Sequence, residues 1–428
     1  MAFTKATFDY LDSGGLINWQ LTAKTSAFTA VSGEGYLVDT SSAAITVTLP
    51  TSPSAGDEII IVDYASNAGT NNITLDPGTL NLRGATDDLV LDNDNQTARL
   101  LYSGATKGWL VTTEAGGIAA AAPALTVDYL VVAGGGGAGG SGGGGGGAGG
   151  LRTSYTNSSS LNGHTESSLS LNASTNYTVT VGAGGNAGIS GPYAQTSGLN
   201  SVFSTITSTG GGVAGRRSDG GSGGSGGGAG VSGPNLYSGG SAVTTPVIQG
   251  YAGGDSSAIW KGGGGGGASE VGQTAPASSA GNGGTGLIVN ILNATNATTE
   301  SVGEVSGSDV YFAGGGGGGG SDSAAGGSYP GGSGGTGGGG DGKGITSGSN
   351  GDDGDPNTGG GAGAGIAATV DGSGGAGGSG VVILRYPSGY TISETTSPTV
   401  LTFNTYIEGS DKVTVFTAGE NGTIQFST

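Results

Sequence analysis

The sequence contains no cysteine and only one histidine, and each shortage excludes a class of chemistry. Without cysteine, the chain cannot form disulfides, thiolate nucleophiles or zinc–cysteine centres. A single histidine, His164, leaves no partner for a two-histidine metal centre. Apolar runs are short as well, because none reaches the roughly 18 residues that a membrane span requires. We therefore predict no cofactor, no metal centre of these kinds and no insertion into a membrane.

Basic residues are also scarce. The chain has 12 lysines and arginines against 31 aspartates and glutamates, which gives a formal net charge of −19. A charge of this sign and size repels nucleic acid and anionic lipid head groups. The N-terminal residues lack the apolar stretch of a signal peptide. We expect a protein that is made in the cytoplasm and has no nucleic-acid partner.

Glycine, in contrast, is abundant and concentrated. Of 101 glycines, 85 lie between Leu125 and Ser388, in runs such as Ala133–Leu151. Ordering one residue's backbone costs about 1–2 kcal/mol, and glycine loses the most freedom. A glycine run has no side chain to bury, so it is either a flexible linker or is held by its backbone. The second alternative is a bundle of extended left-handed helices with three residues per turn, which bond to their neighbours because they form no internal hydrogen bonds.

Several observations favour the bundle over the linker. Apolar residues such as Leu151 and Val231 stand at or near the edges of runs, where they would seal a bundle. The region opens with Leu125–Ala133 and closes with Val381–Tyr386, two short apolar segments that are typical of buried strands. Pairing these strands would join the two ends of the region and define a domain. Shorter strand-like segments lie inside it: Tyr177–Val181, Ser201–Thr207, Leu287–Leu292 and Val310–Ala313. Collagen is excluded, because glycine does not recur strictly at every third residue.

The flanking segments have an ordinary composition that indicates β-structure. Residues 31–115 show strands at short intervals, such as the alternating Ile45–Leu49, which predicts a β-sandwich or β-prism module. Residues 1–30 are interpreted as an N-terminal arm that either docks onto a partner or covers the module's own core. Residues 116–124 form a small-residue linker, 125–388 the glycine-rich bundle domain, and 389–428 a short C-terminal β segment. The predicted fold class is all-β with a polyglycine II helix bundle framed by strands.

Catalytic motifs give no positive signal. Matches to GxGxxG are numerous, but a glycine tract produces them by chance, and none opens a helix after a strand as a dinucleotide site requires. The acidic clusters Asp352–Asp355 and Asp92–Asn95 match neither the calcium loop of helix–loop–helix proteins nor the calcium-binding nonapeptide repeat. A solvated turn is the simpler interpretation of both clusters, and a calcium site is the alternative. We expect a protein that is not an enzyme.

Aromatic residues between the glycine runs are the best candidates for binding. Loops at the ends of a bundle are where side chains accumulate, and tyrosine and tryptophan offer rigid faces with one polar handle. The alternative is that each ring only covers an end of the bundle. His164 lies in a polar stretch and is either a solvated loop residue or a sugar contact. The candidate binding residues are Tyr155, His164, Tyr193, Tyr237, Tyr251, Trp260 and Tyr329.

The alternation of glycine runs with short aromatic and polar segments resembles the distal tail-fibre adhesins of T-even-like bacteriophages. Val127–Gly137, Thr175–Gly185 and Gly377–Pro387 resemble the glycine-rich domain of phage fibre proteins, especially marine ones, and residues 31–112 resemble a β module recurrent in such fibres. The resemblance implies a bundle whose end loops recognise a host surface, in a homotrimer. The chain departs from the T-even adhesins in having a different β module before the glycine-rich domain and a β segment after it.

The sequence therefore predicts a virion fibre protein, made in the host cytoplasm, that binds a host cell-surface glycan or an outer-membrane protein and attaches to other virion proteins. A purely structural virion appendage or capsid spike is the main alternative. A polysaccharide depolymerase would require a pair of carboxylates in the site. A bacterial surface adhesin would normally carry a secretion signal.

Overall fold

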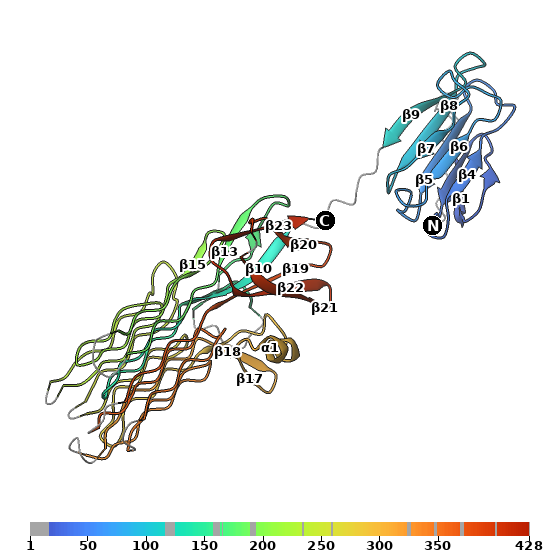
Figure 1. Ribbon diagram of the computed structural model, residues 1–428. Helices are drawn as coiled ribbons and strands as arrows, with labels where there is room; N and C mark the ends of the chain where they lie inside the picture. Colours follow the sequence, from blue (N-terminus) through green and yellow to red (C-terminus); the bar gives the residue numbers. More distant parts are fainter. Residues whose placement is uncertain are drawn as a thin grey trace, which may run out of the picture. The chain divides into compact units, whose positions relative to one another are not determined.

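The structure is a computed structural model that describes residues 17–115, 125–156, 163–164, 166–188, 194–232, 235–257, 260–322, 327–345, 349–368, 372–398 and 400–427. The chain forms two compact units, Met1–Pro123 and Ala124–Thr428, which are described separately (Figure 1). Regular structure in the described ranges is almost entirely β, with 23 strands and one short helix. The predicted all-β class is confirmed. Within these ranges, no helix has the length and apolar character that crossing a membrane requires.

The first unit is a sandwich of two sheets, here called sheet A and sheet B. Sheet A has the strand order β1 (Asn18–Lys24), β3 (Glu34–Val38), β5 (Glu58–Asp63), β8 (Thr97–Tyr102) and β9 (Trp109–Ala115). Sheet B has the order β2 (Phe28–Thr29), β4 (Ile45–Thr48), β6 (Ile73–Asp76) and β7 (Leu89–Leu91). Up to β6 the chain alternates between the sheets, so the first three strands of each sheet pair in parallel.

Alternation of side chains along the strands places one apolar core between the two sheets. Ile45 and Val47 of β4 are buried, as are Ile59 and Ile61 of β5, and all four belong to one cluster that includes the fully buried Trp109. Strands β1 and β2 lie within residues 1–30, so the described part of the expected N-terminal arm belongs to the sandwich. Residues 1–16 and the expected linker 116–124 lie outside the described residues.

The second unit carries three sheets. The largest has the order β11 (Leu151–Thr153), β10 (Thr126–Val132), β19 (Val381–Pro387), β22 (Asp411–Ala418) and β21 (Thr402–Glu408), with β12 (Leu169–Ser170) also paired to β10. The second has the order β15 (Ile206–Ser208), β14 (Ser201–Phe203), β13 (Tyr177–Thr180), β23 (Gly422–Ser427) and β20 (Thr391–Glu394). The third has the order β16 (Leu287–Ile288), β18 (Asp309–Phe312) and β17 (Glu304–Ser306). The predicted pairing of the two framing strands is confirmed, because β10 and β19 pair antiparallel from Asp128 opposite Arg385 to Val132 opposite Val381.

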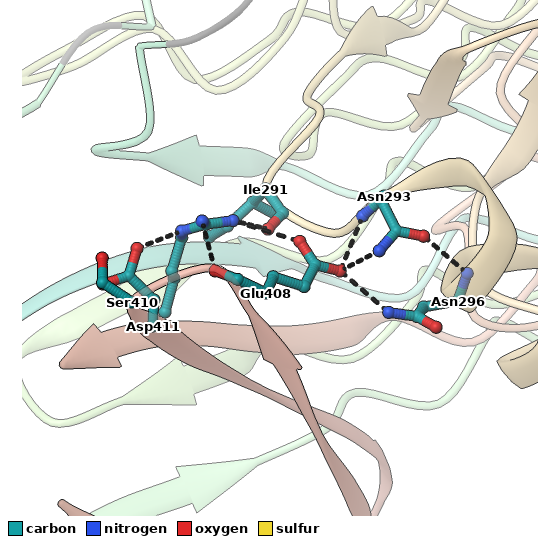
Figure 2. Close-up of polar contacts among 7 residues, drawn as sticks. Ile291, Asn293, Asn296, Glu408, Ser410 and Asp411 are labelled. Carbon is teal, nitrogen blue, oxygen red and sulfur yellow. Dashed lines mark hydrogen bonds and ion pairs between the residues drawn. The ribbon is translucent and has the colours of Figure 1, made fainter. Parts of the chain in front are cut away.

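The C-terminal β segment completes these sheets rather than forming a separate layer. Strand β22 pairs with β19, and β23 pairs with β13. Figure 2 shows how the hairpin of β21 and β22 is joined to helix α1 (Ala294–Glu300). The Glu408 carboxylate accepts hydrogen bonds from the Asn293 backbone N–H at 3.1 Å and from Asn296 Nδ2 at 2.9 Å, while Arg385 forms ion pairs with Glu408 at 3.2 Å and Asp411 at 2.9 Å.

Hydrogen bonds between the glycine runs follow a period of three residues. In the run 142–150, Gly144, Gly147 and Gly150 donate to the run 209–215. The residues between them donate to two other runs in turn: 145 and 148 to the run 263–266, and 146 and 149 to the run 359–362. These N···O distances are 2.8–3.0 Å. A repeat of three is that of an extended left-handed helix with three residues per turn.

The run 142–150 is the central helix of the bundle. Besides donating to three runs, it accepts hydrogen bonds from three others, 133–136, 225–228 and 316–319, which makes six neighbours. A Cβ on Gly145 or Gly146 would lie 2.0 Å from the carbonyl oxygen of Gly316 or Gly136. Only glycine therefore fits at these positions, because each backbone packs directly against the next. The glycine runs form a bonded scaffold, and the linker interpretation is wrong for them.

Candidate binding surface at the far end of the glycine bundle

The glycine helices run back and forth between two ends of the second unit. At the strand end they join β10, β11, β18 and β19, and at the far end they reverse direction, where the described residues include Ser141, 216–219, Ser257, Lys261, Ser321, Tyr329 and Ala367 (Figure 1). The far end is held together by backbone contacts: the Ser141 N–H donates to Gly372 O at 3.1 Å, and Ser321 forms bridges with both Tyr329 and Ala367. Segments far apart in the sequence therefore meet there.

Lys261 and Tyr329 form the best-defined contact of the far end. The Lys261 side chain is buried, with 5% of the residue exposed, and its Nζ donates to Ala277 O at 2.8 Å. The same Nζ lies 4.5 Å from the centroid of the Tyr329 ring, within the range of a cation–π interaction. The ring of Tyr329 is half-buried. The ammonium group fixes the position of an aromatic ring that still reaches the surface.

Trp260 and Tyr237 lie at the same end of the bundle. Trp260 precedes Lys261 in a turn closed by a bridge between Ser257 and Lys261, and it has a φ of 59°. A bulky residue adopts such a left-handed φ only where its surroundings hold it. The Tyr237 N–H donates to Ser256 Oγ at 2.8 Å, and Tyr237 O accepts from the Ser256 N–H at 3.0 Å. Three of the predicted binding residues, each half-buried, thus gather at one end.

The strand end holds three other predicted residues. Tyr155 follows β11 and packs against the main apolar cluster, with the guanidinium carbon of Arg385 5.6 Å from its ring centroid. The Tyr251 N–H donates to Gly267 O at 3.0 Å, and the N–H of the next residue, Ala268, donates to Ala313 O, directly after β18. His164 is bonded to Leu151 and Ala268, so it also lies at this end. The seventh candidate, Tyr193, lies outside the described residues.

His164 is buried, with 1% of the residue exposed, which differs from both interpretations of this residue as an exposed group. Its Nδ1 lies 3.2 Å from Leu151 O and its Nε2 lies 2.8 Å from Ala268 O. Burial lowers the pKa of His164 below the ordinary value of 6.5, although the two carbonyl groups and Glu166 oppose this shift. A neutral imidazole carries one N–H and therefore donates to only one of the two carbonyls. His164 joins two segments of the chain and is not available to a ligand at the surface.

A polar cleft of about 430 Å³ beside Tyr155 did not emerge from the sequence. Asp128 and Glu166 supply its carboxylates, and Asp128 Oδ1 accepts hydrogen bonds from Ser154 Oγ at 2.9 Å and Ser168 Oγ at 2.5 Å. Glu166 is paired with Arg152, which neutralises its charge. Asp128, the charged residue inside the apolar segment 125–133, could have indicated this cleft, because an aspartate in a buried strand needs polar partners.

The acidic clusters use their carboxylates within the protein. Asp353 Oδ1 accepts from the Ala376 N–H at 2.7 Å, Asp352 is paired with Lys343, and Asp94 Oδ1 accepts from the Gly69 N–H at 2.8 Å. Among the described residues, no group of three or more histidine, aspartate or glutamate side chains is placed to hold a metal ion.

One comparison with known families bears on most of the second unit. A family model described as a glycine-rich domain matches residues 112–387, more than half of the chain. The chain belongs to this glycine-rich domain family. No curated protein matches the chain.

The glycine-rich domain, as the family defines it, covers both ends of the bundle. The match begins within β9 and ends at Pro387, the last residue of β19, so it includes all glycine helices and both framing strands. The later strands β20–β23 lie outside the match, although they complete two of the sheets. The family match therefore agrees with the glycine scaffold, whereas binding at the far end depends on the side chains of this chain.

Proposed function

We propose that this chain is a bacteriophage virion fibre protein whose glycine-rich domain recognises a host cell surface without covalent chemistry. The binding surface is the far end of the bundle, with Trp260, Tyr329 and Tyr237 as its aromatic contacts. The ligand is a host surface glycan or an outer-membrane protein. The N-terminal unit attaches the chain to other virion proteins, and the working assembly is a homotrimer, as the resemblance to tail-fibre adhesins implies.

The gathering of aromatic rings at the end of a rigid scaffold carries this proposal. Because the central helix bonds to six neighbours, the bundle fixes the helix ends that carry Tyr237, Trp260 and Tyr329, so a ligand has less backbone to order. Tyrosine and tryptophan are enriched among the residues that dominate binding energies. Two exposed aliphatic side chains lie at the same end, because Leu236 precedes Tyr237 and the Ile345 N–H donates to Ser321 O at 3.3 Å.

Several copies on one particle would bind a repetitive surface tightly even if each site binds weakly. Linked sites raise overall affinity by roughly 10²–10⁴ without any new contact. This expectation suits a recognition surface that presents only a few half-buried rings.

The proposal is tested with the purified full chain, using outer-membrane vesicles and purified lipopolysaccharides from a panel of Gram-negative bacteria as probes. Trp260→Ala should weaken binding to a positive probe by about 30-fold, the equivalent of about 2 kcal/mol for one central aromatic contact. Tyr329→Phe should bind nearly as well as the wild type, because the ring remains over Lys261. Tyr251→Ala is the matched control, since it removes a half-buried ring at the strand end.

Equal losses for Trp260→Ala and Tyr251→Ala would contradict recognition by the far end. If the folded wild-type chain binds none of the probes, the purely structural appendage would be favoured. Release of oligosaccharide from a probe would favour a depolymerase.

A further inference from the structure

Sheet A of the first unit carries an apolar outer face. In β5, Ile59 and Ile61 point into the core, so Ile60 and Val62 point outward. The pairing of the strands places Leu37 beside Val62, and Leu101 beside both Glu58 and Leu110, on the same side of the sheet. We define the apolar face by six outward residues: Trp19, Leu37, Ile60, Val62, Leu101 and Leu110. Five of them are partly exposed, and Trp19 is 42% exposed.

Trp19 extends this face to the edge of the sheet. It stands opposite Gly35, which in turn stands opposite Ile60. A Cβ on Gly35 would lie 2.7 Å from the Trp19 ring, so the ring lies directly on the backbone of β3. Within the described residues, β1 pairs only with β3, and its second backbone edge borders the apolar face. Edge strands of this kind are ready to associate with another chain.

Sheet B carries a more polar outer face than sheet A. The outward residues of β4 and β6 are Thr46, Thr48, Thr74 and Asp76, which pair as Thr46 with Thr74 and Thr48 with Asp76. Two sheets of one sandwich normally cover their inner faces and expose polar outer faces. Sheet B follows this rule except at Val90 of β7, which stands opposite Thr74 and is 41% exposed, whereas sheet A departs from it on all five of its strands. Contiguous exposed apolar surface usually marks a site of association.

The charge on the apolar face is balanced. Glu58 and Arg99 both point outward from it and form an ion pair at 2.7 Å, with 20% and 46% of their side chains exposed. The whole chain carries a net charge of −19, so two copies repel each other over most of their surface. A neutral apolar patch with one cation and one anion is where identical chains can approach, and each charge could pair with its opposite on the other copy.

We propose that the apolar face of sheet A packs against a second copy of this chain. The first unit is then a self-association module in addition to any role in attachment to the particle. This inference does not depend on receptor binding by the second unit.

The absence of cysteine allows a clean test in the full chain. Val62→Cys places one thiol on the apolar face, and Thr74→Cys places one at an equally half-buried outward position of sheet B as the matched control. Maleimide labelling of the Val62→Cys variant should slow by about tenfold as the protein concentration rises past the dissociation constant of the self-association. Labelling of the Thr74→Cys variant should not change with concentration, and sedimentation equilibrium of the wild type should give more than one copy.

A charged variant separates association from folding. Ile60→Lys should return the chain to the mass of one copy with little change in its thermal unfolding, whereas Thr74→Lys should remain associated. A wild-type mass of one copy at all concentrations would overturn the proposal. In that case, equal labelling rates for the two thiol variants would mean that neither a second copy nor the chain itself covers the apolar face of sheet A. Protection of the thiol at position 62 at every concentration would mean that the chain's own residues 1–16 or another part of it cover the face.

Discussion

Replacing Gly146 by alanine tests whether close packing of backbones holds the bundle. Gly146 lies in the central helix, donates to Ala362 O at 2.8 Å and accepts from the Gly316 N–H at 2.9 Å. Its φ is not positive, so alanine can adopt the local conformation. The obstacle is the neighbouring helix, because the new Cβ would lie 2.0 Å from Gly136 O and 2.8 Å from Gly136 C.

The expected loss follows from the hydrogen bonds near this contact. An ordinary Cβ···O contact exceeds 3.0 Å, so the helices must separate by at least about 1 Å. This displacement strains the bond from the Gly136 N–H to Gly147 O at 2.8 Å, which joins the two helices, and the bond from the Ala362 N–H to Gly136 O at 3.1 Å. Leaving two or three such buried groups unsatisfied costs about 1–3 kcal/mol each. The gain from a less flexible unfolded chain is about 0.4–1 kcal/mol, so we expect a net loss of about 1–9 kcal/mol, with a middle value of about 4 kcal/mol.

The assay is urea unfolding of the full chain, followed by circular dichroism and compared with Gly389→Ala. A Cβ on Gly389 meets no atom within 4 Å, and the φ of Gly389 is not in the left-handed region. If the two variants unfold at the same urea concentration, backbone packing in the central helix does not stabilise the domain and the reasoning is wrong.

Three further predictions concern the second unit. Amides of the run 142–150 should be among the slowest to exchange with solvent, because they are buried and bonded to neighbouring runs; rapid exchange by mass spectrometry would contradict a bonded scaffold. Glu408→Gln should lower the free energy of unfolding by about 1–3 kcal/mol in urea, since Arg385 loses one of its two carboxylate partners, and Glu420→Gln on an exposed turn is the control. Because burial lowers the pKa of His164, the unfolded chain binds a proton that the folded chain does not, so stability should fall as the pH drops below about 6.5. His164→Gln should remove this part of the decrease in unfolding temperature, and an unchanged pH dependence would exclude His164 as its source.

Strand positions were predictable where apolar and β-branched residues stand in short runs. Leu125–Ala133 and Val381–Tyr386 became the paired strands β10 and β19 for this reason. Ser201–Thr207 was expected to be one strand, but Ser204 has a φ of 53° and the segment turns there into the hairpin of β14 and β15. Helix α1 was not predicted, because its threonines and asparagine have low helix propensity. The Asn293 side chain nevertheless accepts from the Asn296 N–H, as a helix N-cap does.

Contacts between distant segments were not predictable from local patterns. Strand β23 pairs with β13 across more than 200 residues, and no periodicity near Thr423 indicates that partner. His164 is surrounded by polar neighbours in sequence, yet its two ring nitrogens lie against Leu151 O and the distant Ala268 O. The glycine runs also do not reveal which intervening loop turns at which end. The aromatic candidates therefore could not be divided between the two ends until the path of the chain was known.

Because donors in the central helix repeat every three residues, insertions and deletions in a glycine run preserve the bonding pattern only in multiples of three residues. Removing a single residue from the run 142–150 would rotate each following N–H by a third of a turn, toward a neighbour whose carbonyl already has a partner. Adding three residues to every run would preserve all directions and lengthen the bundle by about 9 Å. Natural variants of such a bundle should therefore differ in length by multiples of three residues within runs, while the turns between runs vary without this restriction.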